Sequence, residues 1–230
     1  MLIKMNILAI IPARGGSKSI PRKNMKLLDE KPLVAYPIEL AKSVSKINKI
    51  IVSTEDEEIK SIAEKFGAEV PFLRPIDLAK DETPTLPVLQ HCIKYLEENQ
   101  DYKADLIFLL YPTNPFLKKE TINQAIKLFE ETNCNSVVSV IKDYGRFWKF
   151  NKDLNKYCLF YPEERVNRQY FTPLYKENGA IYFSNYKTLM MKNKIVADPV
   201  EFIIMNESDL VDIDTFSDWK KAESKMRCIE

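Results

Sequence analysis

Four cations and two glycines gather in one loop near the start of the chain. An apolar run at residues 7–12 opens directly into this loop, which carries Arg14, Gly15, Gly16, Lys18, Arg22 and Lys23. Glycine lets the backbone adopt conformations that other residues avoid, so consecutive N–H groups can converge on phosphate oxygens while the side chains supply positive charge. The alternative is a basic surface loop whose glycines only make a turn. The residue types favour a binding site for a polyanion such as a nucleoside triphosphate.

The spacing of the glycines excludes two common kinds of phosphate loop. The chain contains neither G-x-G-x-x-G nor a Gly-Lys-Ser/Thr with the preceding glycine that a P-loop needs. Dinucleotide cofactors and P-loop chemistry are therefore disfavoured.

A pair of carboxylates, Asp212 and Asp214, lies near the end of the chain. In an extended segment, residues two apart point to the same face, so both carboxylates can meet one cation. Magnesium prefers one or two carboxylates together with phosphate oxygens and water. The alternative is that the pair only caps the helix expected at 215–227.

The elements that must position these residues alternate between strand and helix. Strand 7–12, a helix at 33–45 and strand 49–53 form a first β-α-β unit. Thr54 is expected to cap the next helix, with Glu57 completing a capping box and Gly67 ending the helix, and a short strand is expected at 70–73. The further expected elements are helices at 86–98, 120–132 and 218–226 and strands at 106–110, 136–141, 179–183 and 201–205.

This alternation predicts one α/β domain over residues 1–230, with a mostly parallel sheet covered by helices on both faces. Ligands of such sheets gather beyond the carboxyl ends of the strands, where the basic loop begins.

The alternation breaks at residues 143–176, where aromatic residues mix with charges and no clear helix is indicated. The aromatic residues there include Tyr144, Phe147, Trp148, Phe150, Tyr157, Phe160 and Tyr161. An extended, hairpin-like excursion cannot bury these rings alone, so we expect a partner chain to cover them.

Composition narrows the class of protein further. Lys plus Arg number 34 against 33 Asp plus Glu, a net charge of +1, so no bulk attraction to nucleic acid or to an anionic membrane is expected. The four cysteines form no C-x-x-C pair, and the apolar run at the start is short and contains Pro12. We expect free thiols, no signal peptide or membrane span, and a cytoplasmic location. His91, the only histidine, is expected to be structural.

The order of residues in the basic loop closely resembles that of the acylneuraminate cytidylyltransferase family. Residues 13–24 read Ala-Arg-Gly-Gly-Ser-Lys-Ser-Ile-Pro-Arg-Lys-Asn, and the resemblance continues at 51–59, 66–75, 178–182 and 211–214. It implies a doubly wound, mostly parallel, Rossmann-like nucleotidyltransferase sheet with a hairpin-like dimerisation excursion. It also implies an Mg²⁺-dependent, homodimeric enzyme that joins CTP to a nonulosonic acid of the sialic, legionaminic or pseudaminic type, giving a CMP-sugar and pyrophosphate.

The resemblance assigns roles around CTP residue by residue. Lys23 is expected to face the α-phosphate, Arg14 to stabilise charge, and Asp212 and Asp214 to hold the metal. The expected nucleotide-binding residues are Arg14, Gly15, Gly16, Ser17, Lys23, Asn24, Arg74, Thr83 and Thr85.

A second group of residues is expected around the acceptor sugar. Residues 109–115 read Leu-Leu-Tyr-Pro-Thr-Asn-Pro, so Tyr111 stands where the family usually has glutamine. A phenol differs from an amide in volume and hydrogen-bonding capacity, which favours a modified nonulosonate such as legionaminate or pseudaminate over N-acetylneuraminate. The expected acceptor residues are Tyr111, Lys149, Arg168, Gln169, Asn178 and Tyr182.

Three other functions remain as alternatives. Activation of Kdo or another 2-keto sugar acid uses the same reaction, but that enzyme lacks the Arg-Gly-Gly-Ser-Lys run. A non-catalytic nucleotide-sugar binding protein would tolerate loss of the acidic pair. A glycosyltransferase normally carries its D-x-D in the middle of the chain.

Overall fold

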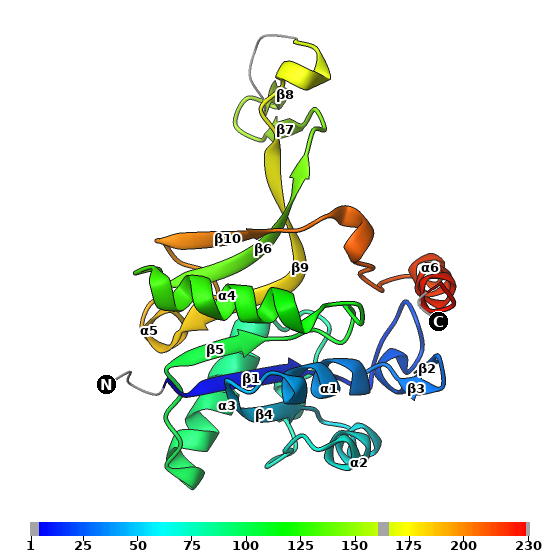
Figure 1. Ribbon diagram of the computed structural model, residues 1–230, viewed down its shortest axis with the longest axis vertical. Coiled ribbons are helices and arrows are strands. Elements are labelled where there is room, and N and C mark those ends of the chain that lie inside the picture. Colours follow the sequence, from blue (N-terminus) through cyan, green and yellow to red (C-terminus); the bar gives the residue numbers. More distant parts are fainter. Residues whose placement is uncertain (1–4, 161–165, 229–230) are drawn as a thin grey trace.

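A central sheet of six strands organises the computed structural model, which describes residues 5–160 and 166–228. The strand order is β10-β6-β9-β5-β1-β4 (Figure 1). Strand β9 runs antiparallel to β5 and β6, and the other pairs are parallel. The strands are β1 (Ile7–Pro12), β4 (Ile47–Ser53), β5 (Leu106–Leu109), β6 (Ser136–Asp143), β9 (Leu174–Asn185) and β10 (Val200–Ile204). The expectation of a mostly parallel α/β sheet is confirmed.

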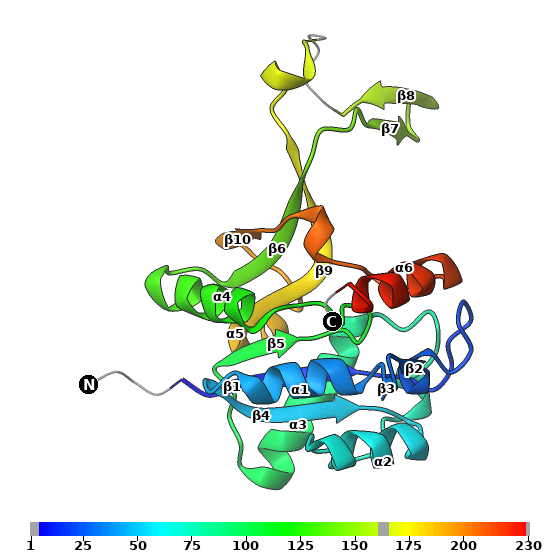
Figure 2. The same ribbon diagram turned by 45° about the vertical axis from the view of Figure 1, so that its right-hand side comes forward.

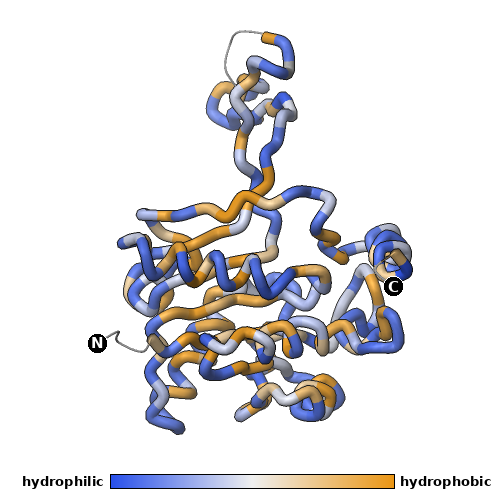
Figure 3. The backbone as a smooth tube through the Cα atoms, in the orientation of Figure 1, coloured by the Kyte–Doolittle hydropathy of each residue, from blue (hydrophilic) through white to orange (hydrophobic). Residues whose placement is uncertain are grey.

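Alternate residues of β1 pack into two separate hydrophobic cores, one on each face of the sheet. Ile7, Ala9 and Ile11 pack with α1 (Ala35–Ser43), α2 (Glu57–Phe66) and α4 (Lys119–Glu131). Leu8 and Ile10 pack with α3 (Thr85–Gln100) and α5 (Tyr186–Met190). Because successive side chains of a strand point to opposite faces, a continuous apolar strand requires cover on both sides. Figure 3 shows the strands of the sheet as mostly hydrophobic.

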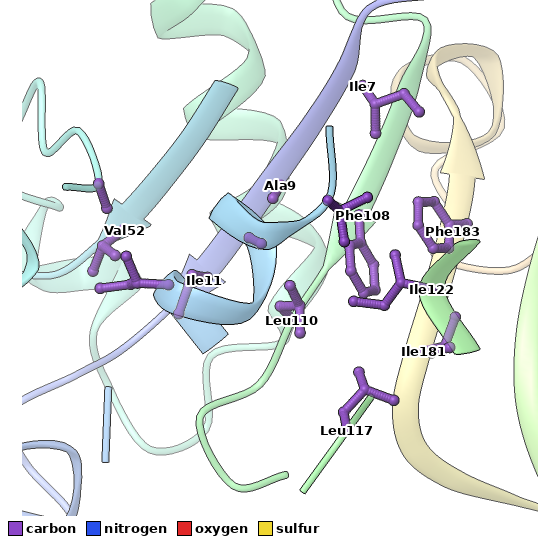
Figure 4. Close-up of a cluster of buried hydrophobic side chains, with 14 of the residues drawn as sticks. Ile7, Ala9, Ile11, Val52, Phe108, Leu110, Leu117, Ile122, Ile181 and Phe183 are labelled. Atoms are coloured by element: carbon purple, nitrogen blue, oxygen red, sulfur yellow. The ribbon is translucent and has the colours of Figure 1, made fainter. Parts of the chain in front are cut away.

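The larger core contains two stacked rings from neighbouring strands. Phe108 and Phe183 lie with their ring centroids 4.1 Å apart and nearly parallel (Figure 4). Both side chains are fully buried. Removing one ring would leave a cavity in a densely packed interior, at a cost of about 3–5 kcal/mol.

Two local expectations about the segment after β4 are wrong. Asp56, not Thr54, caps α2, because the Asp56 carboxylate reaches the N–H groups of Glu58 and Ile59 at 2.9 and 3.1 Å. Thr54 instead accepts from the N–H of Asp56 at 3.1 Å. Residues 70–73 form no strand, and only a single bridge joins Ile51 to Glu69. Gly67 does end the helix in the left-handed conformation, with φ of 92°.

The basic loop and the last helix come together beyond the carboxyl ends of the parallel strands. The loop contains η1 (Lys23–Met25), β2 (Leu27–Leu28) and β3 (Lys31–Pro32), and α6 (Phe216–Met226) lies next to it in both ribbon views (Figures 1 and 2). A third apolar cluster joins the two segments through Ile20, Leu28, Leu33, Phe116, Ile213, Trp219 and Ala222. The helix is capped by Thr215 with Asp218, so Asp212 and Asp214 are not its caps.

The excursion rises from the sheet as a hairpin. Asp143 pairs with Leu174 where β6 and β9 extend beyond the sheet, and β7 (Trp148–Asn151) and β8 (Lys156–Leu159) form a separate antiparallel pair (Figure 2). The remaining short turns are η2 (Ile76–Leu78), η3 (Arg168–Tyr170) and η4 (Glu207–Asp209). The hairpin is confirmed, and its role in dimerisation stays a prediction. Tyr161 lies outside the described residues.

All four cysteines lie in the described ranges and are free thiols, as expected. Over residues 5–160 and 166–228, no helix has both the length and the apolar character needed to cross a membrane.

Candidate active site

A cavity of about 240 Å³ lies at the carboxyl ends of β1 and β5, where strand order reverses around β1. Helical connections leave β1 toward β4 on one side and return to β5 on the other, which is the kind of switch point where open α/β sheets bind ligands. Among the predicted residues, the cavity brings together Arg14, Lys23, Asn24, Arg74, Thr83, Thr85 and Tyr111.

Packing against the turn after β4 holds the start of the basic loop. The N–H of Gly15 donates to Glu55 Oε1 at 2.8 Å. A Cβ on Gly15 would lie 2.4 Å from Asp56 Oδ2 and 3.0 Å from Asp56 Cβ, so a larger residue here would force the loop or Asp56 to shift. Asn24 is buried and donates from its amide to the carbonyl of Arg14 at 2.9 Å. Gly16 is exposed with open space beside it, and neither Gly16 nor the half-buried Ser17 lines the cavity.

Carboxylates pair with the cations of the loop. Asp81 forms ion pairs with Arg14 and with Lys18, the latter at 2.5 Å, and these two cations lower the pKa of the Asp81 carboxyl. Arg22 pairs with Glu58 on α2. The loop is thus positively charged, but each of these cations has a partner that a ligand anion would have to replace.

Lys23 joins the basic loop to the acidic end of the chain. Its Nζ donates to the carbonyl of Ile213 at 2.7 Å and to Asp214 Oδ1 at 3.1 Å, and its side chain is only 12% exposed. The N–H of Ile213 in turn donates to the carbonyl of Thr113, after β5, at 2.9 Å. Three segments far apart in the sequence therefore meet at Lys23.

Asp212 lies beside the loop that follows β5. Its Oδ1 is 3.5 Å from the amide nitrogen of Asn114, and Thr113 also donates to its carboxylate. Although Asp212 is exposed as a residue, desolvation of the carboxylate and the charge of Asp214 raise its pKa, against the opposing effects of Thr113 and Lys23. Two carboxylates that repel each other, one of them desolvated, suit a divalent cation that phosphate oxygens help to coordinate. Within the described ranges, no cluster of three potential ligands among His, Cys, Asp and Glu exists.

Tyr111, after β5, lines the cavity, and Tyr182 of β9 lies beside Tyr111. The hydroxyl of Tyr111 lies 3.0 Å from Thr85 Oγ1, and the ring of Tyr182 meets that of Tyr111 edge-on with centroids 6.4 Å apart. Tyr182 donates to Glu177 at 2.8 Å. Burial raises the pKa of both phenols, so both stay protonated near neutral pH.

Asn178 borders a neighbouring cavity of about 260 Å³ that also contacts Asp212 and Gly179. Its carbonyl oxygen accepts from the hydroxyl of Ser139 at 2.5 Å and from the N–H of Ala180 at 3.2 Å. Its amide nitrogen is buried and has no hydrogen-bond partner in the described part of the chain. Such a donor is suited to an acceptor atom from a ligand.

Three predicted acceptor residues lie away from this cavity. Lys149 is on β7 and lines a groove of the excursion, and Arg168 and Gln169 belong to η3 near the far end of the excursion (Figure 1). Lys149 and Gln169 are exposed. Within one chain, the structure does not bring them to the nucleotide side of the sheet.

Three polar residues that contact the site were not among those predicted from the sequence: Glu55, Asp81 and Asn114. Glu55 and Asn114 follow strand ends at the ligand edge, so the rule that singled out Arg14 could also have found them. For the segment that begins at Asp81, only the hydroxyl residues Thr83 and Thr85 were predicted to contact the nucleotide. His91 packs edge-on against Phe72 with centroids 4.6 Å apart, and burial lowers its pKa. A half-buried imidazole packed against another ring is compatible with the expected structural role.

A doubly wound sheet, a cationic loop after its first strand and carboxylates beside that loop define the class of protein: an enzyme of the nucleotidyltransferase class. The family model described as Cytidylyltransferase matches residues 8–215, and the chain belongs to this family.

Relatives with assigned functions cover the chain almost end to end. The chain is 37% identical over 228 residues to CMP-N,N'-diacetyllegionaminic acid synthase of Legionella pneumophila, covering 96% of this chain and 97% of that protein. It is 33% identical to pseudaminic acid cytidylyltransferase of Campylobacter jejuni, with 95% of each covered. The solved structure of CMP:2-keto-3-deoxy-manno-octonic acid synthetase complexed with CTP aligns with a TM-score of 0.72 at 14% identity, over 98% of this chain and 100% of that one. This last likeness supports the fold.

Proposed function

We propose that the protein transfers CMP from CTP to a nonulosonic acid, giving a CMP-sugar and pyrophosphate. The anomeric hydroxyl oxygen forms a bond to the α-phosphorus, the bond from that phosphorus to the bridging oxygen breaks, and the hydroxyl proton is released. The observation that carries the proposal is Lys23, which lines the cavity together with Arg14 and bonds to Ile213 and Asp214 of the acidic segment.

The triphosphate would lie along the cationic side of the cavity. Arg14 and Lys18 would exchange the carboxylate of Asp81 for phosphate oxygens, while Lys23 would stabilise the charge that develops around the α-phosphorus. Arg74, Thr83 and Thr85 line the same cavity and would contact the nucleotide. Of the remaining loop residues, Gly16 and Ser17 would offer backbone N–H groups. Gly15 would anchor the loop through its N–H to Glu55, and the amide of Asn24 would hold the carbonyl of Arg14.

Asp212 and Asp214 would hold a magnesium ion. Two carboxylates satisfy only part of its coordination, and oxygens of the triphosphate and water would complete it. When bound, the ion would neutralise phosphate charge and orient the leaving group. Lys23 pairs with Asp214 in this structure, so it would lie between the phosphates and the carboxylates that hold the metal.

The acceptor would lie between the tyrosines and Asn178. Tyr111 and Tyr182 offer ring surfaces and protonated hydroxyls, and Asn178 offers a free amide donor. Two relatives that match over most of their length act, by their names, on legionaminic and pseudaminic acids, which supports a modified acceptor beside the phenol at position 111. We therefore propose an acceptor of this modified type, with Kdo as the second candidate.

A second copy of the chain would complete the acceptor side. The excursion exposes large apolar side chains, including Phe147, Phe150 and Phe160, around a groove of about 690 Å³. Covering this surface with a second copy would form a homodimer. Since Lys149, Arg168 and Gln169 lie away from the cavity of their own chain, they would serve the acceptor only across such an interface. The free cysteines are compatible with a reducing cytoplasm, where we place the enzyme.

Pyrophosphate release tests the proposal directly. The protein is incubated with CTP, Mg²⁺ and, separately, legionaminate, pseudaminate, N-acetylneuraminate and Kdo. We expect release with the first two acids, and a loss on the order of 100-fold or more in kcat for Asp212→Ala and Asp214→Ala, because the triphosphate loses its metal. Glu82→Gln, which removes an exposed charge in the loop before α3, is the control. Release with none of the acids, or full activity of both aspartate variants, contradicts the proposal.

A further inference from the structure

Glu55 uses both oxygens of its carboxylate to join two parts of the nucleotide cavity. Oε1 accepts from the N–H of Gly15 at 2.8 Å, and Oε2 accepts from Arg74 Nη2 at 3.0 Å. The side chain of Glu55 is 17% exposed and that of Arg74 only 5%. One carboxylate thus fixes the basic loop to a guanidinium that approaches the cavity from a different segment.

The pairing leaves part of the Arg74 guanidinium available. Arg74 lines the cavity, and its Nε is buried with no hydrogen-bond partner in the described part of the chain. A buried N–H donor without a partner is unfavourable, so a ligand that supplies an acceptor there gains affinity. Because Glu55 holds Nη2, it determines how the rest of the guanidinium faces the cavity.

The backbone around Glu55 supports the same arrangement. The N–H of Arg74 donates to the carbonyl of Thr54 at 2.7 Å, and the N–H of Ala13 donates to the carbonyl of Ser53 at 3.0 Å. The end of β4 is therefore bonded on one side to the start of the basic loop and on the other to the Arg74 segment. Glu55 adds the side-chain link between those two neighbours.

We propose that Glu55 is a positioning residue for CTP: it holds Gly15 and Arg74 in the geometry that receives the nucleotide before the nucleotide arrives. The inference rests on the proposed function only in the choice of ligand. Glu55 does not touch the reacting atoms and is paired with Arg74, so its contribution is to orientation. Binding energy supplied equally to substrate and transition state appears in KM and leaves kcat nearly unchanged.

The substitution Glu55→Gln tests this role with little change in shape. An amide has one acceptor oxygen, so it cannot accept from both Gly15 and Arg74, and its NH₂ faces a donor. Losing one such charge-assisted bond predicts a rise of about tenfold in both the Kd and the KM for CTP, with kcat changed by less than about threefold. Glu57→Gln is the matched control, because it removes the same charge only two residues along the chain. The side chain of Glu57 is exposed, and its ion-pair contact is Lys60 at 3.8 Å.

Calorimetric binding of CTP, steady-state kinetics and a thermal melt are measured on the full chain. If Glu55→Gln fails to fold, Glu55→Asp replaces it: the charge remains, but the shorter side chain cannot span both partners, so weaker CTP binding is again expected. A double-mutant cycle with Arg74→Met then separates positioning from general stability, since residues acting through one another are not additive. We expect the effect of Glu55→Gln to shrink when Arg74 is absent.

CTP affinity of Glu55→Gln within twofold of wild type, or an undiminished effect in the Arg74→Met background, would overturn the inference. Equal weakening by Glu57→Gln would do the same. Binding of CTP is measured without an acceptor and so does not depend on turnover. If the proposed function is wrong, the wild type releases no pyrophosphate. If this inference is wrong, Glu55→Gln and Glu57→Gln bind CTP equally well.

Discussion

At the scale of single residues, the two adjacent glycines of the basic loop are not equivalent. Gly15 packs against Asp56, whose carboxylate is held in place by the first N–H groups of α2. Gly16 has no atom within 4 Å of the position its Cβ would take. Identical residue types, one position apart, therefore face different steric demands.

This difference predicts opposite results for two alanine variants. In Gly15→Ala, the methyl group and the capping carboxylate cannot both keep their places, so the loop shifts. We expect weaker CTP binding by about tenfold or more, together with a loss of stability of about 1–3 kcal/mol from overpacking. Gly16→Ala should bind CTP within about twofold of wild type, because nothing obstructs the methyl group. Calorimetry and urea unfolding measure both, and equal affinities for the two variants would contradict the steric argument.

At the scale of elements, α6 holds the acidic segment against the basic loop. Trp219 and Ala222 of the helix pack with Ile213 and with residues of the loop. The helix begins with a reciprocal capping box between Thr215 and Asp218. Hydrogen bonds from Thr215 and Lys221 lower the pKa of Asp218 to about 2.

The capping box predicts a pH-dependent contribution to stability. A carboxyl whose pKa is lower in the folded than in the unfolded chain stabilises the fold above its unfolded pKa, near 4, and loses that contribution as pH falls toward 2. Asp218→Asn should therefore lower the free energy of unfolding at pH 7 by less than about 1 kcal/mol, a modest value because the site is partly solvated. The difference from wild type should narrow between pH 4 and pH 2 in urea titrations. A difference that stays constant with pH would show that the charge is not responsible, and Glu82→Gln is the control.

At the scale of the whole molecule, the excursion is a part whose large apolar side chains the single chain leaves exposed. It projects from the sheet (Figure 2). Its aromatic residues include Tyr157 and Phe160, which are 70% and 57% exposed. A surface of this kind is typical of an interface.

A double substitution, Tyr157→Asp with Phe160→Asp, should convert the proposed homodimer to a monomer, because burying two carboxylates in an apolar interface is unfavourable. Sedimentation velocity measures the change from twice the chain mass to one chain mass. Met191→Asp is the control, since Met191 is 69% exposed but lies beyond the end of α5, away from the excursion. A wild-type protein that is monomeric at micromolar concentration contradicts the dimer.

Sequence alone determined the parts of this protein that depend on local pattern. The apolar run of β1, the glycine end of α2 and the order of residues 13–24 indicated a parallel sheet and a loop for a polyanion, because strand periodicity and backbone freedom are properties of short segments. The prediction from sequence was wrong where two neighbouring residues could each cap the same helix. Asp56 caps α2 in place of Thr54, since the Asp56 carboxylate reaches two N–H groups. The backbone of Thr54 is already bonded to Arg74.

Only the tertiary structure decided which distant groups meet. Lys23 contacts Asp214 across 191 residues, and Glu55 joins Gly15 to Arg74, pairings that no periodicity encodes. It also placed Lys149 and Arg168 away from the cavity of their own chain, although their residue types alone suit an acceptor site. The reason is physical: contacts of this kind follow from how sheet order and helix packing bring strand ends together, and packing depends on the whole fold at once.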